Sequence, residues 1–420
     1  MLDLKYIREN LDTVKLALGK RTDPAKLDLD TLLVLDDRRR ELIKDSESLK
    51  AERNLSSKSK PTPEMIINLK TLGDKVKELE NSLQLLETDI HDRLAALPNI
   101  PADDVVAGGK ENNEVIYTFG KKPVFSFEAK DHVFLAESLG IIDYERAAKM
   151  SGSGFWCYRG VGALLEWALL SYFINFHNRN GYQFLIPPFL LTEKSAFTSG
   201  HLPKFRDDLF WTQDKLCLNA TSEMMLGNYH REEILPADRL PLKYFAYSPC
   251  FRREAGSYRQ EERGMVRGHQ FNKVEMFIFC KEEDSWKMFD ELVKNAKGLV
   301  EGLGLHYQLS KLAAGDCSAA MAKTYDLEVW LPSMGIYKEV SSVSNALAYQ
   351  ARRGQTRYKN DKGENVFVHT LNGSGLATSR LVPAILEQNQ QADGTVRIPE
   401  ILRQYIPGAP EFILPDINKI

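Results

Sequence analysis

The residues best suited to chemistry are concentrated in the stretch FRREAGSYRQEERGMVRGHQFNKVEMF, residues 251–277. Read as strand, loop and strand, this stretch places Arg252 and Glu254 on one face of its first strand, because side chains alternate along a strand. The loop then carries four further basic residues: Arg259, Arg263, Arg267 and His269. Clustered positive charge of this kind suits a polyphosphate ligand.

The second strand of this stretch carries Phe271, Lys273 and Glu275 at alternate positions, so their side chains share a face. An aromatic ring, an ammonium group and a carboxylate that converge in this way can bind different parts of one ligand. The alternative is a surface network of ion pairs, worth about 0–1 kcal/mol per pair. We expect a binding face built from two neighbouring strands.

The segment EVSSVSN (339–345) is expected to follow a strand and offers Glu339 and Ser342 as oxygen ligands. Mg²⁺ prefers one or two carboxylates together with phosphate oxygens and water. An isolated Glu-Ser pair would mean little, but here it follows a stretch suited to a polyphosphate. The pair therefore predicts a metal site next to that ligand.

The segment LNGSGLATSR (371–380) is rich in small residues. Gly373 and Gly375 would let the backbone approach a ligand closely, although NGSG is also a common turn. Arg380 is predicted to lie one or two turns into the following helix. The order of these segments along the chain favours one shared site.

The elements that position these residues alternate between strand-like and helical runs. The strand-like runs are 182–191, 274–280, 325–332 and 365–372, and the helical runs include 162–177 and 283–303. Several strands are joined by loops too short for parallel crossovers. The pattern predicts a largely antiparallel sheet flanked by helices, an α+β domain.

The first hundred residues have a different pattern. Leucine, valine and isoleucine are spaced alternately 3 and 4 residues apart, as in a coiled coil, at Leu69, Leu72, Val76, Leu79, Leu83, Leu86 and Ile90. The helix should end before Pro98. Leu35, Leu42 and Leu49 repeat every seven residues upstream, and the polar segment 56–63 separates the two runs. This predicts an antiparallel two-helix hairpin.

The hairpin has a narrow apolar stripe between charged flanks, which favours an arm over an ordinary core element. At 1.5 Å per residue, 25 to 35 residues would make an arm of roughly 40–50 Å. Its first helix and tip carry Arg38, Arg39, Arg40, Lys44, Lys50, Arg53, Lys58 and Lys60. Acidic residues nearly balance them, so the charge of the arm is compatible with phosphate binding but does not by itself predict it. The predicted domains are 1–100 with the arm at about 29–97, a linker at 101–114, and 115–420.

Composition excludes several classes of protein. The 420-residue chain has a formal net charge of −3, which argues against a protein that binds nucleic acids nonspecifically over its whole surface. Its five cysteines are scattered without a CxxC pair, which disfavours disulfides and a cysteine-rich zinc site. No run of about 18 apolar residues and no signal peptide is evident. We expect a cytoplasmic protein without a membrane partner.

Several of these segments resemble the motifs of one enzyme family. Residues 251–275 resemble motif 2 of class II aminoacyl-tRNA synthetases in its seryl form, and NGSGLATSR (372–380) is similar to motif 3. GYQFLIPPFLL (181–191) is similar to motif 1, which lies at the dimer interface in that class. LNATSEMMLGNY (218–229) resembles the serine-binding segment, and 325–353 another seryl signature. With the hairpin, which resembles the tRNA-binding arm, the chain is identified as a member of the bacterial-type seryl-tRNA synthetases.

The resemblance implies a class II catalytic domain, ATP and Mg²⁺ as cofactors, and activation of L-serine followed by transfer to tRNA(Ser), with tRNA(Sec) as an additional candidate acceptor. It also implies a homodimer and tRNA binding through the N-terminal arm. The residues implied in catalysis are Arg252, Glu275 and Arg380, and those implied for Mg²⁺ are Glu339 and Ser342. The residues implied in ATP binding are Arg252, Arg253, Glu254, Arg267, Phe271, Glu339, Val340, Ser341, Ser342 and Arg380. The residues implied in serine binding are Thr221, Ser222, Glu223, Arg252, Lys273, Glu275, Asn372 and Ser374.

The resemblance gives individual roles to some of these residues. It implies that Arg252 binds the α-phosphate and the serine carboxylate, and that Glu254 accepts from the adenine amine. Phe271 would stack on the adenine, and Arg380 would cover its other side and contact the γ-phosphate. Arg267 would lie near ATP.

The sequence departs from the family pattern in two places. The usual Thr-Ala-Glu reads Thr221-Ser222-Glu223, and residues 343–348, where Cys, Thr and Asp are common, contain Val343, Ala346, Leu347 and Ala348. These departures suggest a divergent or inhibitor-resistant second enzyme as an alternative. A ligase that charges a carrier protein and a regulatory paralog are further alternatives. KMSGS (149–153) lacks the partner motif of class I enzymes.

Overall fold

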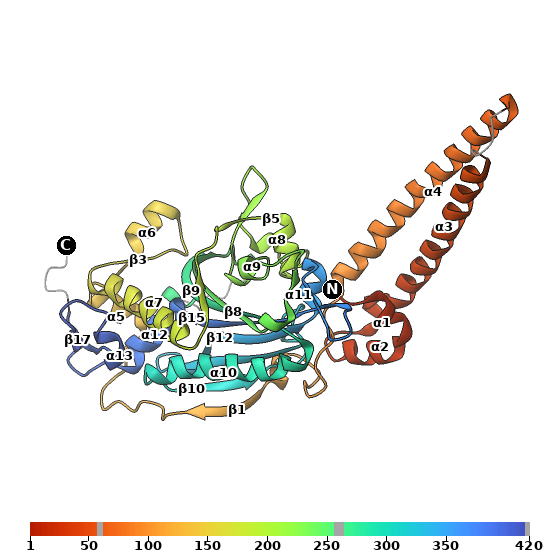
Figure 1. The fold of residues 1–420 in the computed structure, drawn as a ribbon. Coiled ribbons are helices and arrows are strands. Elements are labelled where there is room, and N and C mark those ends of the chain that lie inside the picture. The colour runs from red at the N-terminus through yellow and green to blue at the C-terminus, as the bar shows by residue number, and fades with distance from the viewer. Residues whose placement is uncertain (57–61, 256–263, 416–420) are drawn as a thin grey trace. The chain divides into compact units, whose positions relative to one another are not determined.

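The computed structural model describes residues 1–56, 62–255 and 264–415, which form two compact units, 1–100 and 101–420. The basic residues Lys58, Lys60, Arg259 and Arg263, which the sequence singled out, lie outside the described residues. Figure 1 shows the first unit as helical and the second as a mixed sheet with helices. Within the described ranges, no helix is long and apolar enough to cross a membrane.

The first unit contains the predicted helical hairpin. Short helices α1 (Leu4–Glu9) and α2 (Leu11–Gly19) precede α3 (Leu29–Ser56), which packs against α4 (Pro63–Ala96). The Thr62 side chain accepts a hydrogen bond from the Met65 backbone and caps α4. As predicted, α4 ends before Pro98, because proline cannot continue the hydrogen-bond ladder.

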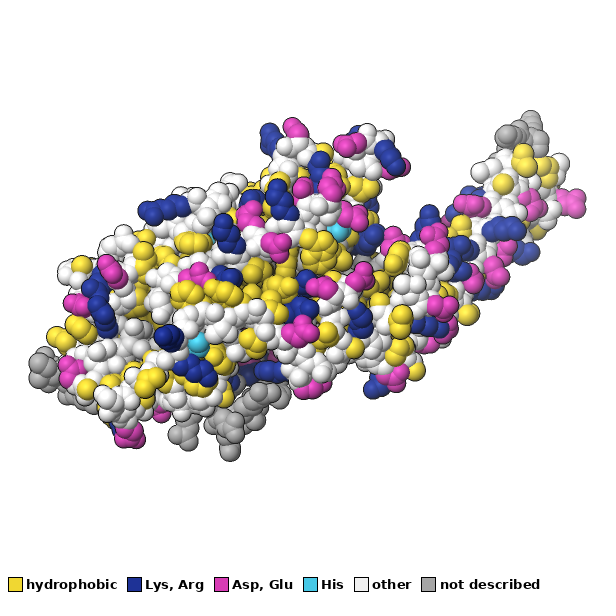
Figure 2. Space-filling model, turned by 90° about the horizontal axis from the view of Figure 1, so that it is seen from below, with side chains coloured by type: hydrophobic (Ala, Val, Ile, Leu, Met, Phe, Trp, Pro, Cys, Tyr) yellow, Lys and Arg dark blue, Asp and Glu magenta, His cyan; other side chains and the backbone are white. Residues whose placement is uncertain are grey.

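A narrow buried stripe with charged flanks lies between the two helices. Val76 and Ile90 of the predicted heptad seam are buried, and Lys50 Nζ lies 2.7 Å from Glu80 Oε1 across the pair. Both charged side chains are about half exposed, so this ion pair contributes little stability. Figure 2 shows basic and acidic side chains intermingled along the hairpin.

The buried Asp36 holds three arginines of this unit together. Its carboxylate accepts hydrogen bonds from Arg8 at 2.8 Å, Arg39 at 2.7 Å and Arg40 at 3.0 Å. Burial opposes ionisation, but these guanidinium donors keep the pKa of Asp36 below its ordinary value. Two of the basic residues expected on the arm, Arg39 and Arg40, therefore also anchor α3 locally.

The second unit is built on a sheet of eight strands in the order β1-β10-β11-β12-β15-β9-β8-β4. All neighbours run antiparallel except β4 and β8, so the predicted largely antiparallel α+β architecture is confirmed. The strands of this sheet are β1 (Glu114–Phe119), β4 (Gln183–Leu185), β8 (Leu242–Phe251), β9 (Gln270–Cys280), β10 (Tyr307–Lys311), β11 (Lys323–Leu331), β12 (Ile336–Leu347) and β15 (His369–Ala377). Smaller sheets contain β2 (Ile142–Asp143), β3 (Cys157–Tyr158), β5 (Leu190–Thr192), β6 (Leu216–Leu218), β7 (Ile234–Leu235), β13 (Arg357–Lys359), β14 (Asn365–Phe367), β16 (Val396–Arg397) and β17 (Phe412–Ile413).

Helices bury one face of the large sheet, and part of the opposite face carries the site. The helices of this unit are α5 (His132–Ser138), α6 (Tyr144–Ser151), α7 (Val161–Arg179), α8 (Glu193–Thr198), α9 (Glu223–Leu226), α10 (Ser285–Gly302), α11 (Tyr349–Gly354), α12 (Thr378–Gln388) and α13 (Glu400–Arg403). Side chains of α7, α10 and α12 join Val274, Met276 and Ile278 of β9 in one apolar core. Because strand side chains alternate, Lys273 and Glu275 point to the opposite face.

Two of the expected strands are divided. The run 182–191 splits into β4 and β5, which belong to different sheets and flank Pro187 and Pro188. Proline donates no ladder hydrogen bond, so it interrupts the strand. The run 365–372 likewise divides at Val368 into β14 and the start of β15.

Candidate active site

Two cavities lie on the face of the large sheet that carries Lys273 and Glu275, and they share part of their walls. The larger has a volume of about 460 Å³ and the smaller about 80 Å³. Both are lined by Arg252, Glu254, Arg267, Lys273, Glu339 and Ser374. Residues from the three sequence segments, which are far apart along the chain, therefore meet in one place.

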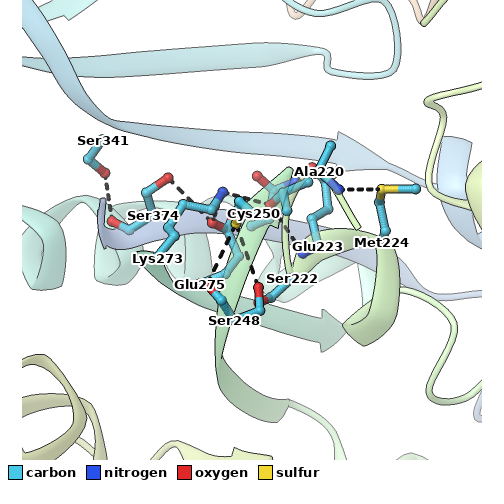
Figure 3. Close-up of polar contacts among 12 residues, drawn as sticks. Ala220, Ser222, Glu223, Met224, Ser248, Cys250, Lys273, Glu275, Ser341 and Ser374 are labelled. Atoms are coloured by element: carbon cyan, nitrogen blue, oxygen red, sulfur yellow. Dashed lines mark hydrogen bonds and ion pairs between the residues drawn. The ribbon is translucent and has the colours of Figure 1, made fainter. Parts of the chain in front are cut away.

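A buried ion pair forms part of the wall of the larger cavity. Lys273 Nζ is 2.5 Å from Glu275 Oε2 and donates a hydrogen bond to Thr221 Oγ1 at 2.6 Å. Ser374 Oγ donates to the same carboxylate oxygen at 3.3 Å, and Figure 3 shows these side chains converging from β9 and β15. A charge pair this deeply buried is stable only when further hydrogen bonds satisfy it, which Thr221 and Ser374 supply.

Glu223, the first residue of α9, lines the same cavity. Its Oε1 accepts hydrogen bonds from Gln350 Nε2 at 2.6 Å and Asn372 Nδ2 at 3.0 Å. Burial, together with the negative charge of Glu275, raises the pKa of Glu223 to about 7. Lys273, the Gln350 hydrogen bond and Arg252 act in the opposite direction. The larger cavity thus has a carboxylate poised to receive a cationic group.

The smaller cavity combines an aromatic ring with arginines. The Arg252 guanidinium lies 5.2 Å from the centroid of the Phe271 ring, and Arg252 Nε donates to the Ala220 carbonyl at 3.3 Å. Arg380 Nη1 donates to the Glu339 carbonyl at 2.7 Å and lies 3.4 Å from Glu339 Oε2. Arg380 is in the first turn of α12, as predicted, so its side chain reaches back over the sheet.

The expected alternation of Arg252 and Glu254 on one strand is wrong. β8 ends at Phe251, and Glu254 has a positive φ of 52°, which turns the chain out of the extended conformation. Both side chains still line the cavities, but a turn positions them rather than a strand face. The Glu254 carboxylate forms an ion pair with Arg267.

The two glycines of the segment 371–380 do not form the turn that NGSG could also have indicated. Gly373 and Gly375 lie inside β15, not in a turn. A Cβ atom on Gly375 would come within 2.2 Å of the buried His177 Nε2, which hydrogen-bonds the Gly375 carbonyl at 2.8 Å. Gly375 is therefore required by packing against α7, while Ser374 faces the cavity.

The predicted metal ligands Glu339 and Ser342 follow the strand β11, as expected, and lie within the next strand, β12. Both line the larger cavity. Asp326, the cross-strand partner of Ser342, is buried, and its Oδ1 has no hydrogen-bond partner among the described residues. Burial and the nearby Glu339 raise its pKa well above the ordinary value. A carboxylate and a hydroxyl beside an unsatisfied buried oxygen fit Mg²⁺ that is also bound by phosphates. The described residues contain no group of three or more His, Cys, Asp or Glu side chains that could hold a metal by themselves.

Most of the predicted site residues line these cavities, and three do not. Ser222 is fully buried and hydrogen-bonds Ser248 Oγ at 2.8 Å. Ser341 is fully buried and donates to the Ser374 carbonyl at 2.7 Å. Arg253 forms neither cavity wall, and its backbone N–H bonds the Asp208 carbonyl at 2.9 Å. Val340 lines only the smaller cavity and contributes its side chain to the core.

Sequence reasoning missed one wall of the larger cavity. This wall comes from the loop after α8 and from the segment before β11, and contains Ser199, Gly200, His201, Phe205, Ser318, Ala320 and Met321. Burial, followed by the charges of Arg252 and Lys273, lowers the pKa of His201 to about 3, so its imidazole is neutral. The small and polar run Thr-Ser-Gly-His at 198–201 was the available signal, but it resembles an ordinary helix end.

Comparison with known protein families places both units. Residues 1–101 match the seryl-tRNA synthetase N-terminal domain, and residues 205–389 match the class II tRNA synthetase core domain (G, H, P, S and T). Among solved structures, seryl-tRNA synthetase from Pyrococcus horikoshii complexed with ATP has a TM-score of 0.92 and 35% identity, covering 99% of this chain and 100% of that chain. Cytoplasmic serine-tRNA ligase from Naegleria fowleri in complex with AMP has a TM-score of 0.88 and 28% identity, covering 99% of each chain.

Curated relatives extend the similarity over the full length. Serine--tRNA ligase 2 of Clostridium acetobutylicum is 51% identical, covering 97% of this chain and 99% of that protein. Serine--tRNA ligase of Exiguobacterium sibiricum is 44% identical over the same shares. These matches favour neither a carrier-protein ligase nor a regulatory paralog. The chain belongs to the seryl-tRNA synthetase family.

Proposed function

We propose that the larger cavity binds L-serine beside ATP and that the enzyme transfers the activated serine to tRNA(Ser). The observation that carries this proposal is the shared wall of the two cavities, where Arg252 and Lys273 lie between a carboxylate-lined end and an aromatic end. Such a wall would bring the carboxylate of an amino acid next to the α-phosphate of a nucleotide.

The carboxylate-lined end suits serine. Ionised Glu223 would bind the ammonium group, and the pair formed by Glu275 and Ser374 offers polar partners for the hydroxyl. A site built to bond a hydroxyl rejects the analogue without it by a factor of ~10⁴–10⁵. Threonine would be excluded sterically, because its extra methyl group would not fit.

The aromatic end suits the nucleotide. Phe271 would stack on the adenine, an interaction of about 1–3 kcal/mol by analogy with base–aromatic stacking. Glu254 would accept from the adenine amine, and its present partner Arg267 would then be available to ATP. The planar forks of Arg252 and Arg380 suit bidentate contacts with phosphate oxygens.

Glu339 and Ser342 would hold Mg²⁺ together with phosphate oxygens. When bound, Mg²⁺ supplies charge neutralisation on the phosphates. Arg252 would hold the serine carboxylate in line with the α-phosphorus, so that an oxygen–phosphorus bond forms as pyrophosphate leaves. Arg380 would neutralise negative charge on the leaving group. A terminal ribose hydroxyl of the tRNA then attacks the carbonyl carbon, and AMP leaves.

The remaining partners follow from the rest of the chain. The helical hairpin α3–α4 would bind tRNA(Ser), with Lys44, Arg38 and Arg53 among its basic residues. The family's motif 1 region, at β4 and β5 here, would form a homodimer interface.

Pyrophosphate exchange tests the proposal most directly. Serine should support exchange of label between pyrophosphate and ATP without tRNA, and no other amino acid should do so comparably. Exchange with a different amino acid and none with serine would reassign the substrate.

A further inference from the structure

Gln350 is a buried glutamine behind the wall of the larger cavity. It lies in α11 and is 2% exposed. Its Nε2 donates to Glu223 Oε1 at 2.6 Å and to the Ser199 carbonyl at 2.9 Å, while its Oε1 accepts from Thr370 Oγ1 at 2.7 Å. A carboxylate and a carbonyl can only accept hydrogen bonds, so the NH₂ group of the amide must face them.

This arrangement fixes how the Glu223 carboxylate is presented. Gln350 and Asn372 both donate to Oε1, which leaves Oε2 without a donor among the described residues. The two bonds come from different elements, α11 and β15, so the carboxylate cannot rotate without breaking both. Oε2 is therefore held ready for a ligand.

Helix α11 also holds the loop after α8, which forms the cavity wall that was not predicted from the sequence. Arg353 Nη1 donates to the Phe197 carbonyl at 2.8 Å and to the Leu202 carbonyl at 2.7 Å. Gln350 bonds Ser199 within this loop. The loop that carries Ser199 and His201 is thus attached to the helix that orients Glu223.

We propose that Gln350 is a positioning residue for serine recognition, which holds the Glu223 carboxylate toward the ammonium group of the amino acid and ties it to the Ser199 loop. This inference rests on the proposed function of the larger cavity. The competing view is that Gln350 is a core amide whose bonds only stabilise the fold.

The electrostatics of the pocket support a recognisable pH signature. The groups that face Glu223 are Glu275, which disfavours its ionisation, and Lys273 and Arg252, which favour it. The Gln350 hydrogen bond also favours the ionised form. Removing it should raise the pKa of Glu223 and shift the acidic limb of kcat/KM for serine to higher pH.

The test compares Gln350→Met with a matched control, Gln390→Met. Gln390 is also buried, and its amide also makes three hydrogen bonds, to the Lys130 carbonyl, the Glu387 carbonyl and the Lys130 N–H. It lines neither cavity. Each variant should lower the melting temperature, so stability alone does not distinguish them.

In pyrophosphate exchange, Gln350→Met should raise KM for serine about tenfold or more, the effect of a lost hydrogen bond to a charged group, while KM for ATP changes less than about threefold. Inhibition by 3-hydroxypropanoate, which lacks the ammonium group, should be nearly unchanged. Gln390→Met should leave KM for serine and the pH profile at wild-type values.

Unchanged KM for serine and an unchanged acidic limb in Gln350→Met, with a lower melting temperature, would overturn the inference. A wild-type enzyme that exchanges with another amino acid would instead contradict the proposed substrate. The same comparison would then be made with that amino acid, because all amino acids carry the ammonium group.

Discussion

Lys273 and Glu275 form an ion pair of 2.5 Å at alternate positions of β9, and their side chains are 7% and 2% exposed. The register of one strand thus places both charges on the face that carries the cavities. The lysine also bonds Thr221, so it links the strand to the segment before α9. The same ion pair therefore contributes to the stability of the second unit and forms part of its proposed serine site.

Lys273→Met should both destabilise the protein and abolish serine activation. Removing one partner of a buried pair leaves Glu275 unpaired, which costs about 3–5 kcal/mol. Urea unfolding measures this loss. Lys50→Met is the matched control, because it breaks the half-exposed pair with Glu80 and should cost less than about 1 kcal/mol. Similar losses in the two variants would contradict the prediction.

Glu223 should give kcat/KM for serine an acidic limb near pH 7. The ammonium group of serine binds the ionised carboxylate, and the pKa of Glu223 is raised to about 7, mainly by burial and then by Glu275. Activity with serine should therefore fall as the pH drops below about 7. Glu223→Gln should lose most of its activity and show no such limb. A limb that persists in this variant would assign the titration to another group.

The Glu223 carboxyl should also make the free energy of unfolding depend on pH. Its folded-state pKa is raised from 4.5 to about 7, so between these pH values the folded protein retains a proton that the unfolded chain releases. The contribution of Glu223 to the free energy of unfolding should therefore decrease as the pH rises through this range. Comparing wild type with Glu223→Gln by urea unfolding at pH 5 and pH 8 measures it. The advantage of Glu223→Gln over wild type should be greater at pH 8.

Arg380→Ala should weaken ATP binding more than serine binding. Arg380 lines only the smaller cavity, and losing a charged hydrogen bond of about 1.5–3 kcal/mol would raise KM for ATP roughly ten- to hundredfold. Arg380→Lys should recover little, because an ammonium group cannot form the bidentate contact. Arg397→Ala, which removes a half-exposed ion pair with Glu411, is the control. An equal rise in KM for serine would contradict a role of Arg380 in ATP binding alone.

Deletion of residues 30–97 should leave serine activation intact and abolish tRNA charging. The two compact units divide at residue 100, so residues 101–420 retain both cavities. Pyrophosphate exchange and aminoacylation of tRNA(Ser) separate the two steps. Charging that survives the deletion would show that the hairpin is not the tRNA-binding element.

The elements with a strong periodic pattern followed directly from the sequence. The heptads that end before Pro98 predicted α4, and the alternation of Phe271, Lys273 and Glu275 predicted the cavity face of β9. In both cases, a local hydrophobic or polar period decides which face is buried. The turn at Glu254 was not predictable, because its positive φ depends on contacts made by the folded chain.

The sequence by itself determined the hairpin, the antiparallel domain and most of the groups that meet in the cavities, because these depend on residue type and spacing. Only the tertiary structure decided how the groups are held. It paired Gln350 with Glu223 across 127 positions and placed Gly375 against His177, which is 198 positions earlier. It also removed Ser222 and Ser341 from the cavity walls. Contacts between distant segments leave no periodic signal along the chain, so packing alone selects which polar groups are buried as supports and which face a ligand.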